Sequence, residues 1–157
     1  MIRTDVSIKL IEKQLCYYHK LKTILEDYYY EIEKKQERQI LKEVFISLNN
    51  WANVGFPICN NYVQTEAEHV IYIIKQNGKI ISFALLAQFN NNYGKYIFYI
   101  YTFPEYRRKG YAYKILEHIK KKNINYKCQP IREEAVKLFQ KFSYEISSIQ
   151  YLFNFHG

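Results

Sequence analysis

Apolar positions along the chain follow helical spacing first and strand spacing afterwards. Residues 6 to about 30 place their apolar side chains on one broad helical face, which predicts one long helix. A second apolar stripe between residues 40 and 48 predicts another helix. An irregular, asparagine-rich connection is expected over residues 49–61, with Trp51 and Phe56 anchored in the core.

The middle of the chain has the pattern of an antiparallel meander. Apolar runs at residues 70–74 and 80–89 flank Asn77-Gly78, the dipeptide preferred in tight hairpin turns. After a second polar turn, the aromatic and β-branched run 97–103 predicts a third strand.

Helical and strand patterns alternate in the last third of the chain. We expect a helix over 111–122, a strand over 124–128, a helix over 133–142 and a final strand in the tail. The strands 97–103 and 124–128 should run parallel, because a helix connects them by a right-handed crossover. The predicted fold class is α/β in the mixed α+β sense: a mainly antiparallel sheet with one parallel β-α-β crossover, flanking helices and a long helical N-terminal part.

Length and composition indicate one soluble domain. The 157 residues fit a single domain over 1–157, with a helical part at 1–60 and the sheet at 70–157. No run approaches the roughly 18 apolar residues of a membrane span, so no membrane partner is expected. Cys16, Cys59 and Cys128 are far apart, which predicts a reduced, cytoplasmic compartment and no structural metal.

Positive charge is concentrated after the strand 97–103. Residues 104–141 contain 11 basic and 4 acidic side chains, which accounts for most of the net charge of +8. Within this segment, Arg107, Arg108 and Lys109 precede Gly110 and the helix that follows. A basic, glycine-containing loop before a helix N-terminus favours anion binding, although a solvated turn has the same composition.

These residues resemble the GNAT superfamily of acyl-CoA-dependent N-acetyltransferases. The family ends a sheet strand near a proline and continues with Arg/Gln-x-x-Gly-x-Gly/Ala at the start of a helix. The matching residues are Thr102, Phe103, Pro104, Glu105, Tyr106, Arg107, Arg108, Lys109, Gly110, Tyr111 and Ala112. The resemblance covers residues 70 to about 145, and it implies acetyl-CoA as co-substrate and a primary amine of unknown class as acceptor.

The resemblance also implies which residues bind the co-substrate. In the family, backbone amides of the loop hold the CoA pyrophosphate, and the strand backbone pairs with the pantetheine arm. Carried over to this chain, the cofactor-binding residues are Ile100, Tyr101, Thr102, Arg107, Arg108, Lys109, Gly110, Tyr111 and Ala112. Lys114 and Lys120–Lys122 are further candidates for the 3′-phosphate.

The sequence departs from the family at the general acid. The usual tyrosine of the last helix is replaced by Phe139, which has no proton to donate. Three explanations remain: Tyr144 or Tyr101 supplies the hydroxyl, the thiolate leaves unassisted, or the domain has lost catalysis. We favour the second.

The general base and the acceptor are not identified by the sequence. No carboxylate lies in the strand 97–103, and Glu66, Glu68 and His69 are candidates by position only. The family places acceptor contacts in its variable helical part and terminal strands. The alternatives to active acetyl transfer are a catalytically weak or inactive acyl-CoA-binding or partner-binding domain and an RNA-directed binder, of which the nucleic-acid partner is not favoured.

Overall fold

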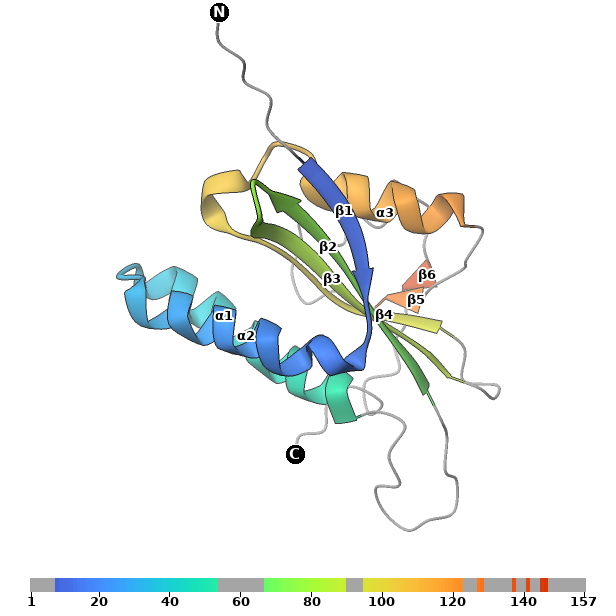
Figure 1. Ribbon diagram of the computed structural model, residues 1–157, viewed down its shortest axis with the longest axis horizontal. Coiled ribbons are helices and arrows are strands. Elements are labelled where there is room, and N and C mark those ends of the chain that lie inside the picture. Colours follow the sequence, from blue (N-terminus) through green and yellow to red (C-terminus); the bar gives the residue numbers. More distant parts are fainter. Residues whose placement is uncertain are drawn as a thin grey trace, which may run out of the picture.

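A mixed sheet with helices on both faces forms the protein. The computed structural model describes residues 8–53, 67–89, 95–122, 127–128, 137, 141 and 145–146. Helices α1 and α2 lie along one face of the sheet and α3 lies on the other (Figure 1). The elements are β1 Ile8–Lys13, the 3-10 turn η1 Leu15–Tyr17, α1 Tyr18–Glu31, α2 Lys35–Asn53, β2 Ala67–Gln76, β3 Lys79–Phe89, β4 Lys95–Thr102, the 3-10 turn η2 Pro104–Tyr106, α3 Tyr111–Lys121, β5 Lys127–Cys128 and β6 Glu145–Ile146.

The strands lie in chain order, from β1 to β6, across the sheet. The pairs from β1 to β4 are antiparallel, whereas β5 runs parallel to β4 and β6 runs parallel to β5. The predicted fold class is therefore confirmed, including the parallel crossover from β4 through α3 to β5.

The predicted hairpin between β2 and β3 is confirmed. Its two turn residues, Asn77 and Gly78, have φ values of 53° and 80°. Positive φ at both central positions is what a tight hairpin turn with the correct twist requires. Strand β2, the first strand of this hairpin, begins at Ala67 and is therefore longer than predicted.

The N-terminal segment differs from its prediction. Residues 8–13 form strand β1, which pairs with β2 along its whole length, and helix α1 begins only at Tyr18. The apolar positions Ile8, Leu10 and Ile11 fit both periods, and pairing with a distant strand decides between them. At the other end of the helical part, α2 extends through Asn53, so the expected irregular connection begins later than residue 49.

Two apolar clusters fill the space on either side of the sheet. On the α1–α2 side, fully buried Leu21, Leu25 and Leu41 pack against the sheet. On the α3 side, Ile115 and Leu116 belong to the buried cluster. Trp51 is fully buried in the first cluster, and its indole N–H donates a hydrogen bond to the carbonyl oxygen of Leu86 (2.7 Å). The expected anchoring role of Trp51 is confirmed.

Some predicted features lie outside the described residues. They include Phe56, residues 124–126 and the helix expected over 133–142, of which only residues 137 and 141 are described. Among the described helices, none combines the length and the apolar character needed to cross a membrane.

Candidate functional site

The loop between β4 and α3 has the geometry of an anion seat. After η2, Arg108 and Gly110 adopt positive φ values of 65° and 84°. Gly110 is the N-cap residue of α3, and no side chain caps this helix end. The N–H groups of the first helical turn have no intrahelical partner, and left-handed residues turn neighbouring amides toward one concavity. Apart from its chain neighbours and the backbone of α3, no described residue lies within 4 Å of the place where a Cβ on Gly110 would be, so the described part of the chain leaves this position open.

Positive charge surrounds this loop. The side chains of Arg108 and Lys109 are exposed. The Lys109 ammonium lies 5.8 Å from the centre of the Tyr106 ring, and the Lys114 ammonium lies 5.7 Å from the centre of the Tyr111 ring. Uncapped amides and cations are the groups that a pyrophosphate requires, so the residues present fit CoA.

Next to this loop, the edge of β4 is paired by another described strand only at its far end. Strand β5 pairs with β4 only at Tyr96 and Ile97, so none of the described strands pairs with residues 98–102 on that side. On the other side, the Thr102 and Ser82 hydroxyl oxygens are 2.8 Å apart, which ties the end of β4 to β3. Residues 100–102, which no described strand pairs with on this side, therefore lie where the backbone of an extended ligand arm could pair with the strand.

Strand β4 contains a bulge that the sequence analysis did not predict. Leu85 pairs with Tyr99 while the next residue, Leu86, pairs with Ile97, so Phe98 is the extra residue. Phe98 and Tyr99 consequently both pack against the cluster on the α1–α2 side. A bulge interrupts the regular ladder locally, and such irregularities are common beside active sites.

A buried carboxylate from α2 connects β4 to the anion loop. The Arg107 Nη1 and Nη2 atoms donate to Oε1 and Oε2 of Glu37, each at 2.8 Å. The Tyr101 hydroxyl donates to Glu37 Oε2 at 2.5 Å, and Arg107 Nε donates to the carbonyl oxygen of Thr102 at 2.8 Å. The guanidinium therefore points into the protein, although Arg107 begins the basic motif.

Electrostatics in this cluster favour a fixed ion pair. Burial raises the pKa of Tyr101, and the hydrogen bond to Glu37 raises it further. Burial alone would lower the pKa of Arg107, but the hydrogen bonds and the charge of Glu37 leave that pKa above its ordinary value. Glu37 also lies in the first turn of α2, where the helix dipole favours a negative charge. The Tyr101 phenol is thus a poor proton donor for a departing thiolate.

Glu37 was missed by the sequence analysis, although the sequence contains a signal for it. The buried stripe of α2 comprises Glu37, Leu41, Val44, Leu48 and Trp51. Their spacing is helical, so one carboxylate occupies the first position of an otherwise apolar stripe. A charged residue at a core position needs a buried partner, and this chain supplies it 70 residues later.

A second carboxylate on α2 lies above β4. The Tyr99 hydroxyl donates to Glu43 Oε1 at 3.3 Å, and both side chains are half-buried. Tyr99 directly follows the bulge residue Phe98. The acidic group that the strand itself lacks is therefore provided by the helix that crosses it.

The other predicted acid–base residues are distributed differently. Glu68 is exposed, and His69 is buried with its ring 5.1 Å from that of Trp51 in an edge-to-face arrangement. His69 lies on β2, two strands and therefore about 10 Å away from β4. Glu66, Phe139 and Tyr144 lie outside the described residues.

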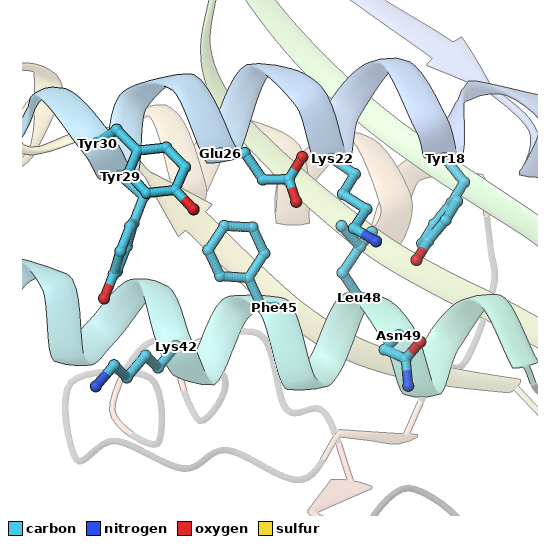
Figure 2. Close-up of a pocket in the computed structure, with 9 residues that line it drawn as sticks. All are labelled: Tyr18, Lys22, Glu26, Tyr29, Tyr30, Lys42, Phe45, Leu48 and Asn49. Carbon is cyan, nitrogen blue, oxygen red and sulfur yellow. The ribbon is translucent and has the colours of Figure 1, made fainter.

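A groove of about 450 Å³ lies between α1 and α2, on the side that faces away from the sheet (Figure 2). Aromatic side chains dominate its wall, and Lys22, Glu26 and Lys42 add charge. The aromatic residues are Tyr18, Tyr29, Tyr30 and Phe45. Neither β4 nor the anion loop contributes to this groove, so it is separate from the candidate site.

Comparison with known protein families identifies the family of this chain. The model of the Acetyltransferase (GNAT) family matches residues 18–144. The chain therefore belongs to the GNAT acetyltransferase family, and the resemblance found in the sequence is confirmed.

Two further comparisons were made. A solved structure similar to this chain is the ribosomal-protein-alanine N-acetyltransferase from Brucella melitensis biovar Abortus 2308. It has 12% sequence identity and a TM-score of 0.49, and the match covers 91% of this chain and 94% of that chain. A search of curated proteins gives no significant match. Within the described part of the chain, no cluster of three or more His, Cys, Asp or Glu side chains is arranged to hold a metal ion.

Proposed function

We propose that this protein transfers an acetyl group from acetyl-CoA to a primary amine by direct attack in a ternary complex. The observation that carries this proposal is the anion seat at Arg108–Ala112, which lies beside the open edge of β4. Family membership supports acetyl transfer in general. The seat and the open edge supply the two binding surfaces that acetyl-CoA needs.

The loop and strand β4 bind different parts of acetyl-CoA. Backbone N–H groups of the loop and of the first turn of α3 hold the pyrophosphate, with Lys109 and Lys114 adding positive charge. The backbone of Ile100, Tyr101 and Thr102 lies along the pantetheine arm. The acetyl group is then directed toward the bulge at Phe98.

The bulge is the proposed site of charge stabilisation. When an amine attacks the thioester carbonyl, negative charge develops on the acetyl oxygen. The irregular pairing at Phe98 and Tyr99 places their backbone beside the expected position of this oxygen, where a main-chain N–H would act as the donor. Such a donor is held in place by the sheet, so it needs no rearrangement during the reaction.

Glu43 is the proposed general base. Its carboxylate is half-buried beside Tyr99, next to the bulge where the amine must approach. An ammonium loses one proton to Glu43, directly or through a water, before the C–N bond forms. The attached nitrogen then loses a second proton to water as the C–S bond breaks, which leaves an amide and the CoA thiolate. The thiolate leaves unassisted, because the Tyr101 hydroxyl is committed to Glu37.

Binding is tested by a thermal-shift titration with acetyl-CoA at constant ionic strength. At 100 times the Kd, binding adds about 2.7 kcal/mol, which raises Tm by about 5–10 °C in a protein of this size. Lys109→Gln should reduce the shift, whereas Lys42→Gln, which removes an exposed charge from the outer side of α2, should not. Absence of a shift in the wild-type protein would contradict the CoA site.

Activity is tested by screening amine acceptors with release of free thiol as the readout. The panel includes peptides with different N-termini, lysine side chains, polyamines and aminoacylated RNA. Acceptor-dependent thiol release is the expected result. Binding of acetyl-CoA without turnover on any acceptor would instead favour the non-catalytic acyl-CoA binder, and salt-dependent RNA binding without turnover would favour the RNA-directed binder.

A further inference from the structure

Arg107 begins the basic loop, but its partly buried side chain makes three hydrogen bonds to protein acceptors. All three nitrogens of its guanidinium donate to acceptors, two of them to Glu37 and one to the carbonyl oxygen of Thr102. The main-chain N–H of Arg107 donates to the carbonyl oxygen of Pro104 at 3.3 Å. A phosphate ligand would therefore have to compete with these protein partners for Arg107.

Glu37, the other member of the ion pair, is more deeply buried than Arg107. The Glu37 side chain is 6% exposed and that of Arg107 is 35% exposed. A buried carboxylate is stable only when its charge and hydrogen-bonding capacity are satisfied, and both oxygens of Glu37 accept from Arg107. The Tyr101 hydroxyl supplies a further hydrogen bond, so the pair is held from β4 as well.

The start of the loop is also fixed from α1. The ring of Tyr28 packs edge-to-face on Phe103 with the centres 4.9 Å apart. The N–H of Phe103 donates to the carbonyl oxygen of Ile81 on β3 at 3.0 Å. Contacts from the α1–α2 layer and from the sheet thus converge on the few residues that set the direction of the anion seat.

We infer that Glu37 and Arg107 are positioning residues: α2 holds the loop in its anion-binding form through this ion pair, and the Arg107 side chain is not a phosphate ligand. The inference rests on the proposed function, because the ligand of the loop is taken to be CoA. When two sites share one fixed contact, a change at one site alters the free energy of binding or ordering at the other. Acetyl-CoA binding and the order of α2, in the helical part where the family places acceptor contacts, should therefore depend on each other.

Glu37→Gln distinguishes the two roles of Arg107 by the sign of the effect. If Arg107 binds phosphate, removal of the neighbouring negative charge frees the guanidinium and strengthens acetyl-CoA binding. If the pair positions the loop, the same change weakens binding, by about 5- to 150-fold in the usual range of such couplings. We expect the second result, measured by isothermal titration calorimetry.

Arg107→Lys provides a milder variant if Glu37→Gln does not fold. Lysine keeps the positive charge but cannot make the paired bonds to Glu37 and the bond to Thr102. We expect weaker acetyl-CoA binding with an unchanged salt dependence, since no ligand charge contact is lost. Arg108→Gln, which removes an exposed charge from the same loop, should instead reduce the salt dependence.

The double variant Glu37→Gln/Arg107→Gln completes the cycle. A positioning pair predicts that the double variant binds acetyl-CoA about as weakly as either single variant, because each single change already breaks the contact. Additive effects, or tighter binding by Glu37→Gln, would overturn the inference.

Hydrogen exchange separates this inference from the proposed function. Without any ligand, Glu37→Gln should increase exchange in peptides covering residues 103–116, and the control Arg108→Gln should leave the exchange of α2 unchanged. Failure of the wild-type protein to bind acetyl-CoA would contradict the proposed function alone. Unchanged exchange in the loop of Glu37→Gln would contradict the positioning role whatever the ligand is.

Discussion

Substitution of Gly110 tests the anion seat most directly. Its φ of 84° and ψ of 14° lie in the left-handed region, where a residue with a Cβ costs about 1–2 kcal/mol. An alanine at this position would meet no atom within 4 Å, so no steric clash is added to the backbone cost. For a chain of this size, Gly110→Ala should lower Tm by about 2–8 °C and leave the fold intact.

Gly110→Glu has the same backbone cost as Gly110→Ala but adds a carboxylate at the seat. Two like charges 4 Å apart repel by about 1 kcal/mol in water and by about 4 kcal/mol at an effective dielectric constant of 20. With the alanine variant as the matched control, the glutamate variant should therefore bind acetyl-CoA about tenfold more weakly or worse. Without ligand, a negative charge at a helix N-terminus is favourable, so the glutamate variant should not be less stable than the alanine variant.

The assay is calorimetric titration of acetyl-CoA into the two variants, at low and at high ionic strength. The difference between the variants should shrink as salt is added, because the repulsion is screened. If the glutamate variant binds within about twofold of the alanine variant at low salt, the pyrophosphate does not lie at this helix end.

Three further predictions concern other parts of the molecule. Glu43→Gln should lower kcat by about 10²- to 10⁴-fold with little change in the KM for acetyl-CoA, measured by thiol release; an unchanged kcat would exclude Glu43 as the base. Trp51→Phe should lower the free energy of unfolding by about 2–4 kcal/mol, measured in urea titrations. The substitution removes the hydrogen bond to the carbonyl of Leu86 and leaves a cavity in the core. Tyr30→Phe, on the exposed side of α1, should change the free energy of unfolding little. Burial, and then the charge of Lys122, lower the pKa of His118. The unfolded chain therefore binds the proton more readily, and the stability that His118 contributes should be present above about pH 6.5 and be lost as the pH falls below it. The Tm of His118→Gln should accordingly vary less with pH between about 5 and 7 than that of the wild type.

Local patterns were sufficient to predict the part of the fold that contains the anion seat. The Asn77-Gly78 turn, the run of β4 and the helical stripe of α3 each specify their structure within a few residues. The loop that contains Gly110 lies between two such segments, so its place at the end of β4 follows from them. Its place in the chain could thus be predicted without information from distant residues, whereas the contacts that hold its conformation come from α1, α2 and β3.

Strand β1 could not be predicted in the same way. A six-residue segment with charges at Lys9, Glu12 and Lys13 satisfies a helical period as well as an edge strand, where exposed charges are common. What decides its structure is the antiparallel ladder with β2, which begins more than 50 residues later in the chain. Propensity within the segment contains no information about that ladder.

The features of the proposed catalytic site that the sequence analysis missed share this property. The bulge at Phe98 depends on how β3 and β4 align, and the contact between Tyr99 and Glu43 spans 56 residues. A search for a base within strand β4 could not find the proposed base, because the carboxylate of Glu43 comes from helix α2. The acidic residue in the apolar stripe of α2 was the one available sign that this helix does more than pack.

The carboxylate of Glu37 explains why the loop can be ready before a ligand arrives. An apolar side chain at this position would continue the stripe of α2 without the cost of burying a charge. It would, however, leave the guanidinium of Arg107 without a counter-charge, and breaking such a pair costs about 3–5 kcal/mol. Arg107 would then turn outward, and the loop would lose its bonds to α2 and to Thr102. A loop held by its own protein has already lost the conformational freedom that binding would otherwise have to remove, so we expect the ion pair to increase the proposed affinity for acetyl-CoA without touching the ligand.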